Sequence, residues 1–119
     1  MTEAPHTITY DQNLKYAIDK MQELGVRHLP VLQAGKLFGI LSERDIRFLE
    51  SFEKVDPKEL KVEDACTEGP YTVETDSQLS DVCATMADRK IGSALVLEGG
   101  KLVGIFTWVD ALKVIARSL

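Results

Sequence analysis

Apolar residues recur along this chain at the two spacings that distinguish helices from strands. Between residues 14 and 24 they stand three and four positions apart, which is the pattern of an amphipathic helix with one buried face. Asp11 or Asn13 can cap the start of this helix, and Gly25 suits its end. The pattern therefore predicts a helix that begins near residue 14 and ends at Gly25.

The segment after this helix has the pattern of strands. Residues 28–33 and 37–41 are short apolar runs separated by a glycine-bearing turn, which predicts a β-hairpin. Residues 6–9 alternate weakly and predict a small strand before the first helix. After the hairpin, Ser42 opens a second predicted helix with an apolar stripe at Ile46, Leu49 and Phe52. The predicted order is β-α-β-β-α.

This order occurs twice. A shift of 65 places residues 1–50 on residues 66–115 without a gap, and fifteen positions are identical. A fixed-period repeat indicates one supersecondary unit used twice. We therefore predict an α+β fold of two β-α-β-β-α repeats, packed with pseudo-two-fold symmetry. The predicted boundaries are residues 1–52 for the first repeat, 53–65 for a charged linker with a helical turn or two, and 66–119 for the second repeat.

Composition narrows the classes of function. The net charge of −5 and the pI near 5.0 argue against general binding to nucleic acid or to an anionic membrane surface. No apolar stretch approaches the length of a membrane span, and the two cysteines lack a metal-type spacing. We expect a cytoplasmic protein without a metal site. Met1 aligns with Cys66, and residues 61–65 have no counterpart before Met1, which suggests that the chain is a trimmed piece of a longer polypeptide.

One local motif could carry chemistry, and it occurs in both repeats. Residues 39–45 and 104–110 each end a strand in a hydroxyl residue, with an aspartate three positions later. The hydroxyl and the acid can together cap a helix. The same geometry can also bind a nucleotide, because free N–H groups at a helix start attract phosphate and a carboxylate can accept both ribose hydroxyls. The sequence leaves both interpretations open.

The duplicated hairpin and motif resemble the cystathionine-β-synthase (CBS) domain, and two such domains in tandem form the pair called a Bateman module. Residues 1–8 and 25–31 also match the family pattern, so the resemblance covers essentially the whole chain. It implies a regulatory module that binds an adenosine-containing ligand, such as AMP, ADP, ATP or S-adenosylmethionine, and that acts on an attached or partner protein. It implies no catalysis and no required cofactor.

The resemblance also implies two clefts, each of which mixes the two repeats. The first cleft would contain Ser42, Arg44 and Asp45 with Tyr71, Ile91, Gly92 and Ser93. The second would contain Thr107, Trp108 and Asp110 with Thr2, His6, Val26, Arg27 and His28. By the same resemblance the two aspartates would hold ribose hydroxyls, and Ser42 and Thr107 would face phosphate.

The clefts are expected to bind unequally, because Arg27, His28, Arg44 and Arg47 have uncharged counterparts in the second repeat. For Arg44 and Arg47, a solvated helix face remains an equal alternative. Trp108 could equally serve in a core or a dimer interface.

Surplus apolar helix surface predicts a homodimer. It includes Phe48 and Phe52 in the first repeat and Trp108, Leu112, Ile115 and Leu119 in the second. A function from another class also fits the repeat, namely a ligand-free scaffold for dimerisation. Asp45 and Asp110 favour ligand binding, since a scaffold needs a helix cap but no ribose acceptor.

Overall fold

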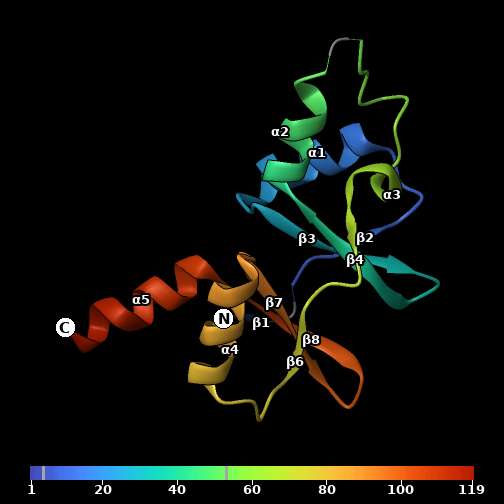
Figure 1. Ribbon diagram of the computed structural model, residues 1–119. Helices are drawn as coiled ribbons and strands as arrows, with labels where there is room; N and C mark the ends of the chain where they lie inside the picture. The colour runs from blue at the N-terminus through green and yellow to red at the C-terminus, as the bar shows by residue number, and fades with distance from the viewer. Residues whose placement is uncertain (4, 53) are drawn as a thin grey trace. The chain divides into compact units, whose positions relative to one another are not determined.

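The computed structural model describes residues 1–3, 5–52 and 54–119. Two residues therefore lie outside the described ones: Ala4, in the N-terminal segment of residues 1–8, and Glu53, at the start of the predicted linker. Both repeats have the predicted β-α-β-β-α order, and the α+β class is confirmed (Figure 1). The first repeat contains β2 (Ile8–Thr9), α1 (Leu14–Leu24), β3 (His28–Gln33), β4 (Lys36–Ser42) and α2 (Glu43–Glu50). The second contains β6 (Thr72–Glu74), α4 (Leu79–Arg89), β7 (Ser93–Glu98), β8 (Lys101–Thr107) and α5 (Trp108–Ser118).

Three further elements lie outside this order: β1 (Thr2–Glu3), α3 (Val62–Ala65) and β5 (Thr67–Glu68). The chain divides into two compact units. The first unit contains residues 6–70, and the second contains residues 1–5 and 71–119. The sheet order is β2-β3-β4-β5 in the first unit and β1-β8-β7-β6 in the second. Strand β1 precedes the first repeat in the chain but belongs to the sheet of the second repeat. Strand β5 precedes the second repeat but belongs to the sheet of the first. The sequence pattern did not predict this exchange.

Glycine permits the close approach of one exchanged strand. Gly39 on β4 pairs with Glu68 on β5, and a Cβ atom at residue 39 would lie 2.4 Å from the backbone oxygen of Thr67. At the equivalent Gly104, an added Cβ would instead meet the flexible side chain of Met1, at 2.6 Å from its Sδ. The backbone contact explains why residue 39 must lack a side chain.

The ends of α1 follow the sequence prediction. Asn13 is the N-cap, and its Oδ1 accepts a hydrogen bond from the backbone N–H of Lys15 at 2.7 Å. Gly25 ends the helix in the left-handed region, with φ of 67°, a conformation that favours glycine. Leu14 and Ala17 on the inner face of α1 are buried in the core of the first unit, as the spacing predicted.

Part of the predicted linker is built into the first unit. Val62 on α3 is fully buried in the same core as α1. The backbone N–H of Leu14 donates to the carbonyl of Leu60 at 2.8 Å. Residues 60–65 therefore pack over the start of α1 and are a structural part of the first unit.

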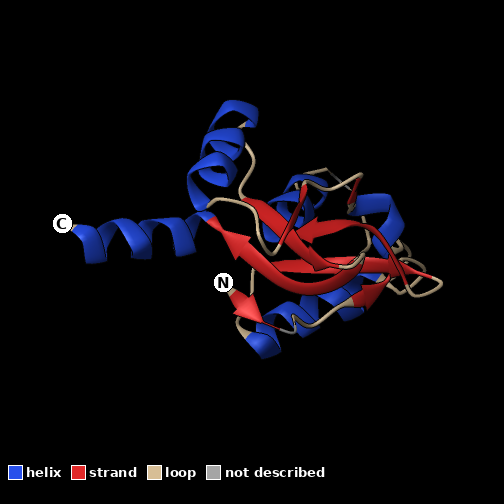
Figure 2. Ribbon diagram, turned by 90° about the horizontal axis from the view of Figure 1, so that it is seen from below, coloured by secondary structure: helices blue, strands red, loops and turns tan. Residues whose placement is uncertain are grey.

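The second unit has less cover over the equivalent positions. Leu79 stands at the start of α4 where the first unit has Leu14, yet it is 43% exposed while Leu14 is 1% exposed. None of the residues of α5 is buried. Helix α5 extends away from the strands of its own unit toward the C-terminus (Figure 2).

Candidate functional site

The first copy of the hydroxyl–aspartate motif lies where β4 ends and α2 begins. Ser42 is the N-cap of α2, and its Oγ accepts a hydrogen bond from the backbone N–H of Asp45 at 3.0 Å. The half-buried Asp45 carboxylate accepts no hydrogen bond and forms no ion pair among residues 1–3, 5–52 and 54–119. At this copy the serine caps the helix, so the acid remains available as an acceptor.

The second copy engages its acid differently. The backbone N–H of Thr107 donates to Oδ2 of Asp110 at 2.9 Å, and the Thr107 hydroxyl donates to the same oxygen at 3.3 Å. The ammonium group of Met1 lies 3.7 Å from the other oxygen, Oδ1. Asp110 therefore caps the N-terminus of α5 together with Thr107, which matches the capping interpretation. Nucleotide binding at either copy remains a prediction.

In the first unit, the start of β3 lies beside this motif. His28 is opposite Ser42 in the antiparallel register of β3 and β4, and the carbonyl of Arg27 accepts from the backbone N–H of Glu43 at 2.9 Å. Burial lowers the pKa of His28, and the nearby charge of Asp45 acts in the opposite direction. His28, Ser42 and Asp45 therefore form one local cluster.

Cys66 lies at the edge of the same cluster. Burial raises the pKa of its thiol, and the charges of Glu68 and Asp45 add to this effect. A thiol with a raised pKa is a poor nucleophile at neutral pH. We therefore assign Cys66 a packing role beside the motif, and sequence analysis had not connected it with Asp45.

The second unit repeats this neighbourhood with other residues. Ser93 is opposite Thr107 in the register of β7 and β8. The backbone N–H of Trp108 donates to the carbonyl of Gly92 at 3.0 Å, and Ile91 is half-buried against the core of this unit. The hairpin thus brings the start of its first strand to the end of its second.

The hairpin register fixes which expected site residues are neighbours within one unit. Residues 26–28 lie beside Ser42 in the first unit, and residues 91–93 lie beside Thr107 in the second. The grouping that the resemblance implies, with residues 91–93 in the cleft of Ser42 and residues 26–28 in the cleft of Thr107, combines residues of different units and remains a prediction.

The other expected site residues occupy the strand starts. Tyr71 accepts a hydrogen bond on its carbonyl from the backbone N–H of Leu95 at 2.9 Å. The Arg89 guanidinium lies 5.3 Å from the centre of the Tyr71 ring, a cation–π contact that the sequence did not predict. Thr2 pairs through its backbone with Ile105, and His6 is exposed just before β2.

The arginines near the first motif differ in their partners. Nε of Arg27 lies 3.7 Å from Oε2 of Glu43, and Arg47 pairs with Oε1 of the same carboxylate. The exposed Arg44 forms no ion pair within the part of the chain that the structure describes. Arg44 is therefore the cation of this cluster that is not neutralised by Glu43.

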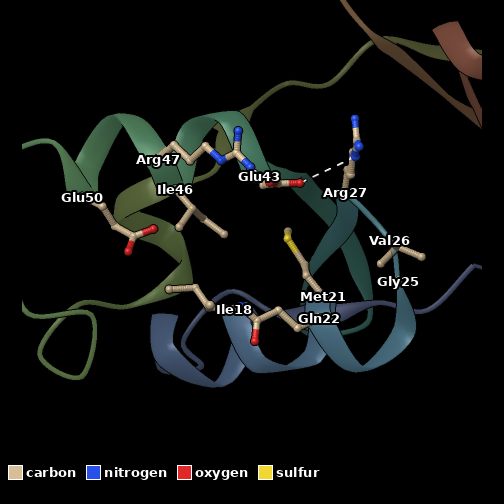
Figure 3. Close-up of a pocket in the computed structure, with 10 residues that line it drawn as sticks. All are labelled: Ile18, Met21, Gln22, Gly25, Val26, Arg27, Glu43, Ile46, Arg47 and Glu50. Atoms are coloured by element: carbon tan, nitrogen blue, oxygen red, sulfur yellow. Dashed lines mark ion pairs between the residues drawn. The ribbon is translucent and has the colours of Figure 1, made fainter.

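A cavity of about 390 Å³ lies between α1 and α2 of the first unit (Figure 3). Its apolar wall includes Met21 and Ile46, and charged side chains from α2 stand at its rim. Neither Ser42 nor Asp45 lines it. The cavity is therefore distinct from the candidate site, even though Val26 and Arg27 contribute to both regions.

Residues 1–3, 5–52 and 54–119 contain no group of three or more His, Cys, Asp or Glu side chains placed to bind a metal ion. The same residues form no helix with the length and apolar character needed to cross a membrane.

Comparison with known proteins identifies the repeat. The model of the CBS domain family matches residues 1–50 and again residues 62–117. The uncharacterised protein YlbB of Bacillus subtilis is 32% identical over 112 residues, which are 92% of this chain and 75% of that protein. An inosine-5'-monophosphate dehydrogenase of Korarchaeum cryptofilum is also 32% identical, over 105 residues that are 87% of this chain but 21% of the dehydrogenase.

Solved structures show the same fold. A protein with CBS domains from Burkholderia ambifaria superposes with a TM-score of 0.85 and 28% identity, over 96% of this chain and 84% of that one. The structure of CBSX2 in complex with AMP gives a TM-score of 0.85 with 24% identity, over 99% of this chain and 94% of that one.

Proposed function

We propose that this chain, which belongs to the CBS domain family as a tandem pair and is thus a regulatory module, binds an adenosine-containing ligand through its first hydroxyl–aspartate motif. The observation that carries the proposal is the Asp45 carboxylate, which is free of hydrogen bonds and ion pairs among the described residues. Ser42 already caps α2, so Asp45 is not needed for the helix start.

The surroundings of Asp45 suit the two polar parts of such a ligand. A carboxylate can accept from both hydroxyls of a ribose, and hydrogen bonds to a charged group are the stronger kind. The Ser42 hydroxyl keeps its own hydrogen for donation to a phosphate, and the start of α2 contributes a positive dipole end. Arg44 can add positive charge there.

The ligand class is supported by a relative. CBSX2 has been solved with AMP bound, and AMP has the ribose and the phosphate that this motif would contact. ADP, ATP and S-adenosylmethionine share the adenosine part, so they remain candidates. The regulated protein, attached or separate, would respond to occupancy of this site.

A ligand-free role is favoured at the second motif by one specific observation. Asp110 is already engaged by the backbone and hydroxyl of Thr107, so a ribose would have to displace these bonds. We therefore expect one strong site per chain, at Asp45, and weak or no binding at Asp110. A chain that binds nothing at either motif would be a scaffold only.

A thermal-shift panel of AMP, ADP, ATP, NAD and S-adenosylmethionine would identify the ligand, because a compound that binds only the folded state raises the apparent stability. Calorimetric titration of the best ligand then tests the residues. Asp45→Asn should weaken binding about tenfold or more, since each lost charge-assisted bond is worth roughly 1.5–3 kcal/mol. Asp110→Asn should leave the affinity nearly unchanged.

The matched control is Asp19→Asn, which removes a surface carboxylate that pairs, among the described residues, only with Lys15 on α1. It changes the net charge by the same amount and should leave binding intact. The proposal fails if no compound of the panel binds, or if Asp45→Asn binds like the control while its unfolding temperature is unchanged.

A further inference from the structure

The cavity between α1 and α2 of the first unit has a size that suits a small molecule. Its volume of about 390 Å³ lies near the lower end of the range of about 300–1,000 Å³ in which small-ligand sites fall. Neither Ser42 nor Asp45 lines the cavity. A ligand bound there would therefore be separate from one bound at the hydroxyl–aspartate motif, and the inference below does not rest on the proposed function.

The walls of this cavity are apolar. Met21 on α1 and Ile46 on α2 are 5% and 3% exposed, and both side chains point into the space between the two helices (Figure 3). Ile18 and Val26 line the cavity beside them. Walls of this kind favour a ligand with an apolar part, because binding removes apolar surface from water.

One end of the cavity rim carries an excess of positive charge. Nε of Arg27 lies 3.7 Å from Oε2 of Glu43, and Arg47 pairs with Oε1 of the same carboxylate. Two guanidinium groups thus share one carboxylate, and most of their N–H donors are left unused by these contacts. Arginine binds carboxylates through parallel hydrogen bonds, so this end of the rim suits the carboxylate of a ligand.

The other end of the rim is negative. Glu50 stands at the end of the cavity opposite Arg27 (Figure 3). Within the described part of the chain, its carboxylate forms no ion pair. The side-chain amide of Gln22 on α1 also lines the cavity and can donate or accept a hydrogen bond. This end therefore suits an ammonium group, and the cavity has a positive end, an apolar wall and a negative end.

The charges of the rim are not a requirement of the repeat. Three charged rim residues of α2 have apolar counterparts on α5 of the second repeat, at the offset of 65. The pairs are Glu43 and Trp108, Arg47 and Leu112, and Glu50 and Ile115. Both helices form, although one has charged and the other apolar residues at these positions. The arrangement of charges is thus specific to the first unit.

We propose that the α1–α2 cavity binds a free α-amino acid with an apolar side chain. The ligand carboxylate lies at Arg47, its ammonium group lies at Glu50, and its side chain packs against Met21 and Ile46. Residues three positions apart on a helix have Cβ atoms about 5–6 Å apart. The two charged groups of an α-amino acid share one carbon, so a single small ligand can reach both residues. A nucleotide brings only negative ionic charge and would be repelled by Glu50.

Titration of the ¹⁵N-labelled chain with L-leucine, followed by two-dimensional NMR, tests the proposal. Saturable shifts should appear at residues of α1 and α2, with a dissociation constant in roughly the millimolar range, because the side chains of Arg27 and Arg47 are 72% and 76% exposed and exposed ion pairs are weak. Isoamylamine and 4-methylpentanoate each keep the apolar part but carry only one of the two charges. Each should bind about fivefold more weakly than L-leucine, and glycine should bind more weakly still.

Variants at the two ends of the rim test the assignment of charges. Glu50→Gln and Arg47→Gln should each weaken L-leucine binding about fivefold. The matched control is Glu23→Gln, which removes an exposed carboxylate of α1 that does not line the cavity, and it should leave binding unchanged. Asp45→Asn should also leave it unchanged, which separates this site from the hydroxyl–aspartate motif. All four positions lie on helices and Asp45 is half-buried, so circular dichroism checks that each variant is folded.

Four results would overturn the proposal. The first is the absence of saturable shifts with L-leucine, L-isoleucine, L-methionine and L-phenylalanine. The second is glycine binding as tightly as L-leucine, which would exclude a role for the apolar walls. The third is a single-charge analogue binding as tightly as L-leucine. The fourth is unchanged binding in folded Glu50→Gln and Arg47→Gln, which would show that these side chains form only a solvated rim.

Discussion

Replacing Gly39 and Gly104 by alanine, one at a time, tests the strand exchange with an internal control. Both glycines occupy the same position of the repeat, and both are buried. At Gly39 the new methyl group would lie 2.4 Å from the backbone oxygen of Thr67 and 3.2 Å from its carbonyl carbon. At Gly104 it would meet the end of the Met1 side chain, at 2.6 Å from Sδ. A side chain can rotate away, whereas a strand backbone must move as a whole.

The expected magnitudes follow from this difference. Overpacking against a fixed backbone costs about 1–3 kcal/mol, and displacement of β5 would add the loss of its pairing with β4. Alanine restricts the unfolded chain and returns about 0.4–1 kcal/mol at both positions. Gly39→Ala should therefore lower the free energy of unfolding by about 1–2 kcal/mol, while Gly104→Ala should change it by less than about 0.5 kcal/mol.

Urea denaturation followed by circular dichroism measures both values, with equal m-values as the check that both variants unfold in the same way. If Gly39→Ala proves as stable as Gly104→Ala, then β5 does not pack on β4 at the distance described here. The reasoning would also fail if Gly104→Ala were the more damaging change.

Three further predictions use matched or single positions. Leu14→Ala should cost about 2–5 kcal/mol of stability and Leu79→Ala about 1 kcal/mol or less, because they are 1% and 43% exposed; equal losses in urea denaturation would contradict the burial described. Asn13→Ala should cost about 1 kcal/mol through loss of the α1 cap, whereas Gln78→Ala should cost almost nothing, since Gln78 makes no capping hydrogen bond; comparison of thermal unfolding tests this pair. Because burial lowers the pKa of His28 from 6.5, the unfolded chain binds a proton first as the pH falls, so stability should decline below about pH 6.5 and level off below the folded pKa; His28→Gln should flatten that part of the profile, and an unchanged slope would rule out His28 as its source.

Much of the fold was predictable because the pattern appears twice. The spacing of apolar residues and the caps at Asn13 and Gly25 located α1, and the 65-residue offset located α4. The hairpins and the starts of α2 and α5 followed in the same way. These features depend on local sequence, which is the level at which periodicity and capping act.

The exchanged strands were not predictable, because β1 and β5 are two residues long and carry no period. The different hydrogen bonding of the two aspartates was also not predictable from the sequence. Asp45 and Asp110 have the same spacing from their hydroxyl residues, yet one is free of hydrogen bonds among the described residues and the other caps its helix. Small differences in side-chain geometry decide between these outcomes, and the sequence pattern does not contain them.

The exchange of β1 also dictates an order of events during synthesis. The first unit is continuous in sequence, residues 6–70, so it can fold while the remainder is still being translated. The sheet of the second unit is complete only when Thr2 meets Ile105, a contact that closes almost the entire chain and carries the entropy of a very long loop. Residues 2 and 3 thus leave the ribosome before the first unit but are among the last to find their partner, and a chain that stops before β8 would leave β1 unpaired.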